Sequence, residues 1–203
     1  MCKSNSNIVF ECNIIKSMGR TEKSFAAIHQ GLERLLLQSD YESISVSDII
    51  DESKVARSTF YAHYRSKDDV LTELTNHIFE HVFSSNLKKE KEHDFSHSPA
   101  FDYRHIVIHT FCHFHEDKAL IGAIFRSSAS HIFTESLREK SLPLIEAIYS
   151  LDPTFMEGAP KEIAIAILQG AFIDLLKSYT TTERQETPEE MAGFFFKIRF
   201  PLA

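Results

Sequence analysis

The chain has 203 residues, of which 43% are apolar and 25% charged, and its formal net charge is −7. This length suits one or two domains, and the composition is that of an ordinary folded protein, which excludes a disordered or fibrous chain. The longest nearly uncharged apolar stretch, residues 163–173, is well short of the ~20 residues that a membrane span needs, so we expect no membrane segment.

The amino end and the cysteines indicate a cytoplasmic protein. The first residues contain no continuous apolar run of the kind that a secretory signal requires. The three cysteines, Cys2, Cys12 and Cys112, are odd in number and form no C-x-x-C pair. This pattern argues against a disulfide framework or a structural zinc site and favours the reducing cytoplasm.

Basic charge is concentrated in one short segment. Residues 53–67 hold Lys54, Arg57, Arg65 and Lys67 and no acid, whereas the remainder of the chain holds 18 of the 22 basic residues and all 29 acidic ones. Because fields between exposed charges fade over ~8 Å at physiological salt, this basic segment can contact phosphate locally despite the acidic body.

Apolar residues recur at helical spacing from the start of the chain, which predicts an all-α fold of about nine helices. The first predicted helix covers residues 21–38. Ser45 with Asp48 forms a capping box that opens a short second helix, a third covers residues 57–62, and Ser66 caps a fourth.

The polar stretch 84–100 is the best internal boundary. Beyond it we expect helices around residues 103–114 and 121–125, one over 130–151 that bends or breaks at Pro143, an apolar one over 161–179, and a last one from Thr187. The predicted division is a flexible extension (1–17), a small amino-terminal helical domain (18–65), a connecting helix and linker (66–100), and a larger carboxy-terminal helical domain (101–203).

Two short helices separated by residues 53–56 match a helix-turn-helix. A recognition helix needs apolar residues beneath it and polar ones on the face that enters the ~12 Å major groove. Phe60 and Tyr64 meet the first need. The outward residues are Arg57, Ser58, Thr59, Tyr61 and His63.

The run YESISVSDIIDESKVARSTFYAHYRSKDDVL, residues 41–71, closely resembles the DNA-binding domain of the TetR (tetracycline repressor) family. That family follows a T-V-x-x-I-A-x-x-A-G-V-S helix and turn with T-F-Y-x-H/Y-F-x-S/N-K-x-x-L, and residues 21–71 match without a gap. Two positions depart from the pattern. Lys54 stands where the turn glycine is usual, which implies strain if its φ is positive, and Ala56 replaces the serine cap.

The carboxy-terminal half matches the family loosely, and its ETPEEMAGFF segment, residues 186–195, looks like the last-helix opening of some TetR-type regulators. The resemblance implies a homodimer joined by a four-helix bundle from the last two helices of each subunit. It also implies transcriptional repression that a small molecule relieves.

The recognition helix supplies the candidate base contacts. Arg57 is suited to bidentate readout of guanine, and the alternatives are a phosphate contact or a solvated charge. Ser58 and Thr59 are expected at base edges or the sugar–phosphate backbone, or else they cap the helix. Tyr61 and His63 resemble the family's phosphate-contacting positions, with aromatic packing as the alternative.

Residues outside the recognition helix supply candidate phosphate contacts. Lys67 joins a cation to the free amide groups of a helix start, which makes a phosphate site. Ser45 and Ser47 add hydroxyls, although helix capping already explains Ser45.

His105, His109 and His113 recur every four residues, so adjacent pairs could share a metal ion. They lie roughly opposite the apolar face of their helix, and a solvated or pocket-edge face is the simpler interpretation. No metal or other cofactor is predicted.

The chain holds 17 phenylalanines, most of which must form the core. The run 194–196 is best placed at the dimer interface. The candidate lining of an effector pocket is Phe111, Phe114, Phe125, Phe133 and Phe172.

Enzymatic motifs are absent: the sequence has no G-x-S-x-G, no glycine-rich phosphate loop and no H-E-x-x-H. We therefore predict a dimeric DNA-binding regulator, a repressor of TetR type that a small apolar or aromatic ligand releases from a palindromic operator. One alternative is a TetR-like protein-interaction module that has lost operator binding. Another is a helical metal-dependent enzyme that uses the histidine face.

Overall fold

A computed structural model describes residues 20–83, 103–151 and 156–199. Within these ranges the protein is all helical, which confirms the predicted fold class. The elements are α1 (Arg20–Leu36), the 3-10 turn η2 (Tyr41–Ser43), α2 (Val46–Ser53), α3 (Arg57–His63), α4 (Lys67–Val82), α5 (Tyr103–Glu116), α6 (Lys118–Arg126), α7 (Ser130–Leu151), α8 (Lys161–Thr181) and α9 (Pro188–Arg199). The predicted extension 1–17 and the polar stretch 84–100 lie outside the described residues.

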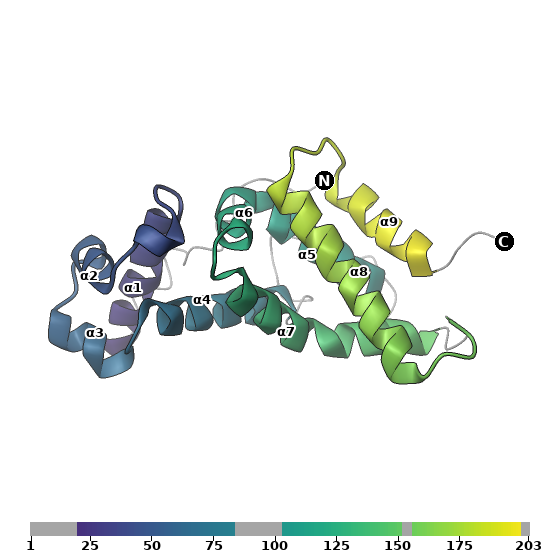
Figure 1. Ribbon diagram of the computed structural model, residues 1–203, viewed down its shortest axis with the longest axis horizontal. Helices are drawn as coiled ribbons and strands as arrows, with labels where there is room; N and C mark the ends of the chain where they lie inside the picture. The colour runs from purple at the N-terminus through teal and green to yellow at the C-terminus, as the bar shows by residue number, and fades with distance from the viewer. Residues whose placement is uncertain (1–19, 84–102, 152–155, 200–203) are drawn as a thin grey trace.

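Helices α1–α3 form a small unit at one end of an elongated molecule (Figure 1). The apolar stripe of α1 is buried at Ile28, Leu32 and Leu36. Gly31 lets α2 approach this helix closely, since a Cβ added there would lie 3.1 Å from Cβ of Ser53. A side chain at Gly31 would push α2 away and, with it, the turn that leads to α3.

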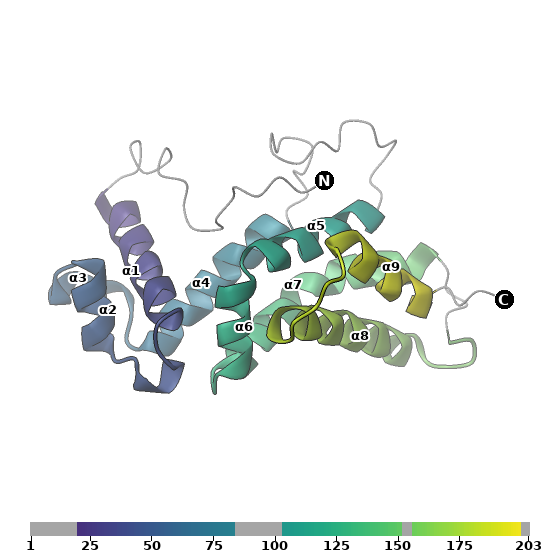
Figure 2. The same cartoon turned by 90° about the horizontal axis from the view of Figure 1, so that it is seen from above.

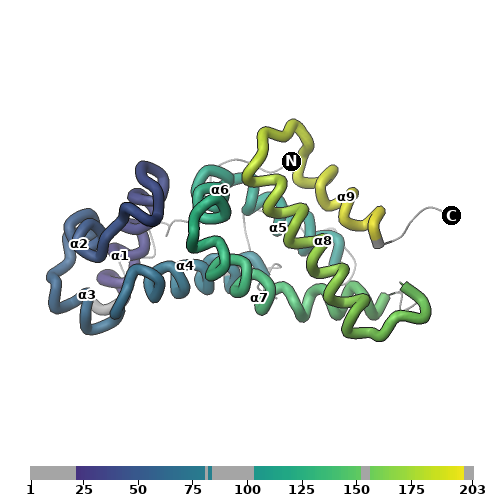
Figure 3. Tube along the Cα trace, in the orientation of Figure 1, coloured from purple at the N-terminus to yellow at the C-terminus, as the bar shows by residue number. Residues whose placement is uncertain are grey.

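Helix α4 connects the small unit to the larger one. Its stripe of Leu71, Leu74 and Ile78 is buried along its whole length, as the helical spacing predicted. The tube in Figure 3 follows α4 from the end of α3 to a position alongside α7. The two units therefore share this helix, and its buried stripe belongs to one hydrophobic core that continues from the small unit into the larger one.

Helices α5–α9 form the larger unit, with α9 beside α5 and α8 on the other side of α9 (Figure 2). Helix α7 is not broken at Pro143, because it is helical from Ser130 to Leu151. Helices α6 and α8 touch through their backbones at Gly122, where an added Cβ would lie 2.6 Å from the carbonyl oxygen of Thr180. Because the backbones are in contact at this point, we expect a displacement of either helix to displace the other.

Helix α8 is long and apolar enough to cross a bilayer by length and composition alone. Half of its most apolar window is buried inside the protein, as is common for the core helix of a folded domain. Its outer face nevertheless keeps Ile163 and Ile167 exposed, at 51% and 46%. On α9, Phe194 and Ile198 are 39% and 44% exposed. These four residues are named the α8–α9 apolar face below.

The cysteine expectation needs a correction. Cys112, buried in α5, is disulfide-bonded in the structure. The other two cysteines lie outside the described residues. Three cysteines leave room for one disulfide bond even without a C-x-x-C pair, and a bond of this kind can be buried.

A buried carboxyl lies where the two units meet. Glu33 of α1 is 4% exposed, and its Oε2 atom has no hydrogen-bond partner among the described residues. Burial, reinforced by the nearby Asp117 at the start of α6, raises the pKa of Glu33 to about 7. The carboxyl is therefore protonated in the folded protein at pH values where the unfolded chain ionises it.

We expect the stability of the protein to fall as the pH rises from about 4.5 to about 7, because a raised carboxyl pKa favours the folded state only while the group holds its proton. Glu33→Gln removes this dependence. The free energy of unfolding of Glu33→Gln minus that of the wild type should grow by about 3 kcal/mol over this window. Urea denaturation at pH 4.5, 6 and 8 measures this difference, and a constant difference would contradict the assignment.

Candidate DNA-binding surface

The turn between α2 and α3 contains a lysine whose backbone lies in the left-handed helical region. Lys54 has φ 57° and ψ 27°, the conformation that glycine adopts without cost. The predicted strain at this position is thus confirmed. Ala56 precedes α3 without a side-chain hydrogen bond to the helix, which fits its lack of a capping group.

Lys54→Gly should stabilise the protein by about 0.5–1 kcal/mol, since glycine relieves the left-handed strain at the expense of some chain entropy. Lys54→Ala is the matched control, because it removes the same charge and long side chain but keeps Cβ. Thermal unfolding of both variants measures the effect. Equal midpoints for the two variants would show that the turn is unstrained.

Helix α3 is anchored from below by aromatic rings. Phe60 and Tyr64 are 0% and 2% exposed, as predicted, and their ring centroids lie 5.6 Å apart. The Tyr64 hydroxyl forms a 3.0 Å hydrogen bond with Nε2 of His29 on α1. Burial, with a smaller contribution from His77, lowers the pKa of His29 to about 4, so this imidazole is neutral at physiological pH. The end of α3 is thereby fixed to α1.

The opposite face of α3 carries the predicted contact residues. Arg57, Ser58, Tyr61 and His63 are exposed, and Thr59 is half-buried. The Arg57 guanidinium lies 5.6 Å from the centre of the Tyr61 ring, one helical turn away. His63 packs one side against Phe25 of α1, with ring centroids 4.5 Å apart. The face therefore offers a cation, hydroxyls and aromatic edges on a rigid base.

Both flanking helices begin with capping boxes. The Ser45 hydroxyl accepts from the amide of Asp48 at 3.2 Å, and the Asp48 carboxylate accepts from the Ser45 amide at 2.8 Å. The predicted capping role of Ser45 is thus confirmed, while Ser47 is exposed in the first turn of α2. At α4 the Asp69 carboxylate accepts from the amides of Arg65 and Ser66, at 2.8 and 3.0 Å.

Lys67 is engaged inside the small unit. Its ammonium donates to the carbonyl oxygens of Tyr41 and Ile44, at 2.6 and 2.8 Å, and lies 4.3 Å from the centre of the Tyr41 ring. Sequence reasoning assigned this residue to phosphate and missed the carbonyls, which lie 23 and 26 residues away in the chain. A phosphate contact through Lys67 stays a prediction.

Two of the three histidines on α5 are buried rather than solvated, which corrects the sequence interpretation at these positions, whereas His105 is half-buried. His109 and His113 are both 1% exposed, and their Nε2 atoms lie 2.9 Å apart. The reason is that α5 is enclosed by α4, α6, α7, α8 and α9, so the face opposite its apolar stripe is also covered. Among the described residues, no group of three or more His, Cys, Asp or Glu side chains is arranged to hold a metal ion.

The five phenylalanines proposed for an effector pocket are all buried and pack against other rings. Phe133 lies 4.9 Å from Phe125 and 6.3 Å from Phe114, and Phe111 lies 6.2 Å from Phe172. Two cavities formed by described residues lie elsewhere: a cleft of about 680 Å³ between η2 and α6, and one of about 520 Å³ beside α4 and α7. The effector pocket stays a prediction.

The run 194–196 also differs from expectation. Phe195 and Phe196 are buried, and Phe195 packs on Phe172 with ring centroids 5.2 Å apart, so both belong to the core of their own subunit. Phe194 is the exposed member. Three consecutive positions span 200° or so of a helix, so they cannot all face a partner.

Comparison with known proteins agrees with this geometry. Residues 28–74 match the family described as "Bacterial regulatory proteins, tetR family", and residues 102–199 match "Transcriptional regulator C-terminal region". The chain belongs to the TetR family. This TetR-family chain thus combines the family's helix-turn-helix DNA-binding domain with the C-terminal region of a transcriptional regulator.

A curated relative of the TetR-family chain is the uncharacterised HTH-type transcriptional regulator YuxN of Bacillus subtilis (strain 168), with 26% identity over 156 residues. The match covers 77% of the chain and 46% of YuxN, so the chain spans about half the length of this relative.

Two solved structures share the fold. A TetR transcriptional regulator from Streptococcus agalactiae 2603V has a TM-score of 0.65 at 23% identity, covering 89% of this chain and 96% of that one. A TetR-family regulator from Syntrophomonas wolfei str. Goettingen has a TM-score of 0.65 at 18% identity, covering 91% and 98%.

Proposed function

We propose that the protein is a homodimeric, cytoplasmic repressor that binds a palindromic operator and leaves it when a small apolar or aromatic ligand binds the larger unit. The observation that carries the proposal is the two-sided recognition helix. Phe60 and Tyr64 anchor α3 while Arg57 and Tyr61 remain free of the core. Such a helix is suited to enter a major groove without disturbing its own domain.

The α8–α9 apolar face supports the homodimer. Its four residues are apolar and between 39% and 51% exposed, and an exposed apolar patch on a folded domain marks an interaction surface. Gly170 of α8 and Gly193 of α9 also face open space, since a Cβ added at either position would meet no atom within 4 Å. A second copy that brings the same face covers all of these residues by two-fold symmetry.

The buried aromatic rings support an apolar effector. A ligand that inserts among these rings would replace contacts between the rings with contacts between the rings and the ligand. The rings are Phe111, Phe114, Phe125, Phe133 and Phe172. Helix α4 then tilts, and the distance between the two recognition helices changes. By reciprocity, a ligand that weakens DNA binding is itself weakened by DNA, by the same factor.

Selection from random DNA with the full chain tests the proposal, followed by a mobility shift on the selected site. We expect an inverted repeat whose half-site centres are about 34–36 Å apart or somewhat further. A single asymmetric half-site would contradict the dimeric mode. The alternative function, a protein-interaction module without operator binding, is favoured by the strained Lys54 turn and the uncapped Ala56, and failure to enrich any sequence would support it.

Arg57→Ala should weaken operator binding by about 1–3 kcal/mol and relax the preference at one base position, because a base contact serves one position alone. Lys67→Ala is the comparison: loss of the expected phosphate contact weakens all sequences alike and lowers the salt slope by about one. Because this variant also loses the two carbonyl hydrogen bonds to η2, its free energy of unfolding is measured alongside. Affinities for the selected site and its single-base variants distinguish the two. If Arg57→Ala weakens every site equally, Arg57 contacts phosphate rather than a base.

A further inference from the structure

The short turn η2 is fastened firmly to the first turn of α4. The Lys67 ammonium donates hydrogen bonds to the carbonyl oxygens of Tyr41, the first residue of η2, and of Ile44, the residue that follows η2. The hydroxyl of the buried Tyr41 donates a hydrogen bond to the carboxylate of Asp68. Three residues of α4 and η2 therefore hold each other, and η2 cannot move without the start of α4.

On its other side η2 reaches the larger unit. Oε1 of Glu42 accepts a 2.7 Å hydrogen bond from the backbone amide of Ser128, in the turn between α6 and α7. Hydrogen bonds from the Ser128 side chain and amide lower the pKa of Glu42 to about 2, so the carboxylate is ionised throughout the physiological range. The bond joins residues 86 positions apart in the chain.

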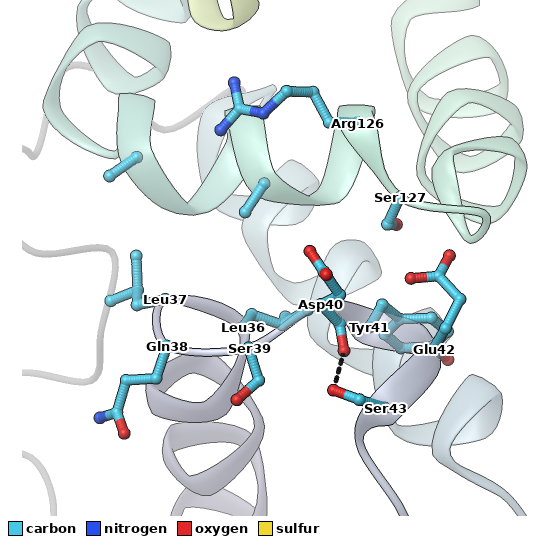
Figure 4. Close-up of a pocket in the computed structure, with 12 residues that line it drawn as sticks. Leu36, Leu37, Gln38, Ser39, Asp40, Tyr41, Glu42, Ser43, Arg126 and Ser127 are labelled. Atoms are coloured by element: carbon cyan, nitrogen blue, oxygen red, sulfur yellow. Dashed lines mark hydrogen bonds between the residues drawn. The ribbon is translucent and has the colours of Figure 1, made fainter.

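This bond crosses the edge of an open cleft. Figure 4 shows the loop from Leu36 to Ser43 facing α6, with the carboxylates of Asp40 and Glu42 directed toward the α6 side and the guanidinium of Arg126 directed away. The cleft has a volume of about 680 Å³. Because the two walls are not packed together along the cleft, a bond across its edge controls their separation there.

The α6–α7 turn is held by two hydrogen bonds of its own. The Ser127 hydroxyl donates to the carbonyl of Ile124 at 2.8 Å and accepts from the amide of Ala129 at 3.2 Å. At the far end of the path, Asp69 on α4 holds the amides of Arg65 and Ser66, the residues that follow α3. Hydrogen bonds thus connect the α6–α7 turn to the residues that follow the recognition helix, by way of η2.

We propose that Glu42 is a positioning residue that couples the α6–α7 turn to the recognition helix through η2, in parallel with the apolar stripe of α4. The bond is solvent-exposed, so its contribution to stability is small. Its effect is geometric: it holds the DNA-binding unit at a defined orientation to the larger unit. In the dimer this orientation sets the spacing of the two recognition helices. The inference rests on the proposed function.

The test is discrimination between operator spacings. We would measure the affinity of the full chain for the selected operator and for versions with the half-sites one base pair closer or further apart. Glu42→Ala should reduce the wild-type preference for the native spacing by about threefold or more, because the recognition helices are held less strictly. Glu42→Gln keeps an acceptor oxygen and should restore part of the preference.

Glu183→Ala is the matched control, since Glu183 is an exposed carboxylate in the loop between α8 and α9, outside η2 and the α6–α7 turn. It should retain the wild-type spacing preference. If Glu42→Ala also retains it, the proposed coupling is wrong. A uniform loss of affinity at all spacings would equally overturn it, because that result indicates general weakening of the DNA-binding unit.

Hydrogen exchange without DNA separates this inference from the proposed function. Glu42→Ala should speed exchange at Ser128 and also in η2 and the first turn of α4, whereas Glu183→Ala should change none of these. Faster exchange at Ser128 alone would show that the bond exists but transmits nothing, and would overturn the coupling. A chain that enriches no DNA would contradict the proposed function, while the exchange pattern would still decide whether Glu42 couples the two units.

Discussion

Phe133→Ala is expected to lower the free energy of unfolding by about 3–5 kcal/mol. The Phe133 side chain is 0% exposed and lies at the centre of an aromatic cluster, with ring centroids 4.8 Å from Phe79 and 4.9 Å from Phe125. Its removal leaves a cavity bordered by rings from α4 and α6, which rigid aromatic neighbours cannot fill. Urea denaturation followed by circular dichroism measures the loss.

Phe133→Leu is the control, because it retains most of the apolar volume and should cost less than the alanine variant. The experiment also bears on the effector prediction. A ring that borders an empty pocket makes fewer van der Waals contacts, so its removal costs less stability. A decrease in the free energy of unfolding below about 1 kcal/mol for Phe133→Ala would therefore contradict tight packing around this ring.

Ile167→Glu should convert the dimer into a monomer and weaken operator binding by at least about 30-fold. Ile167 lies on the outer face of α8, within the α8–α9 apolar face, and in the proposed dimer each subunit would bring one introduced carboxylate into an apolar interface. Two buried like charges disfavour association strongly. Sedimentation equilibrium gives the oligomeric state, and a mobility shift gives the affinity.

The control is Leu151→Glu, which introduces the same charge at a 59% exposed leucine at the end of α7, outside the α8–α9 apolar face. It should remain dimeric. If Ile167→Glu is dimeric and Leu151→Glu is monomeric, the subunits associate through another surface.

The helix-turn-helix could be predicted in detail because its signals are local. Each of these signals involves residues only a few positions apart in the chain. They are the Ser45–Asp48 capping box, the spacing of Phe60 and Tyr64, and the lysine at position 54 in place of glycine. Local propensity and local hydrogen bonding act over the same range as the sequence pattern. These features therefore appear in the structure as expected.

The features that could not be predicted depend on distant partners. Helical spacing places His109 and His113 opposite an apolar stripe, but it contains no information on how many helices surround α5. In the same way, the ammonium of Lys67 is suited to phosphate or carbonyl oxygen, and the choice depends on where Tyr41 and Ile44 lie. The hydrogen bond between Glu42 and Ser128 could not be predicted from the sequence around either residue, because the two lie 86 positions apart in the chain.

The backbone contact at Gly122 connects subunit association to the orientation of the DNA-binding unit. Helix α8 carries half of the proposed dimer face, it touches α6 at Gly122, and α6 leads into the turn that Glu42 holds. In the proposed dimer, assembly and operator affinity are therefore linked equilibria. Dilution below the dimerisation constant should loosen the orientation of the small unit even before DNA is released. The ligand concentration needed for half-release is then expected to depend on total protein concentration, so the cellular copy number of the regulator would help to set its sensitivity.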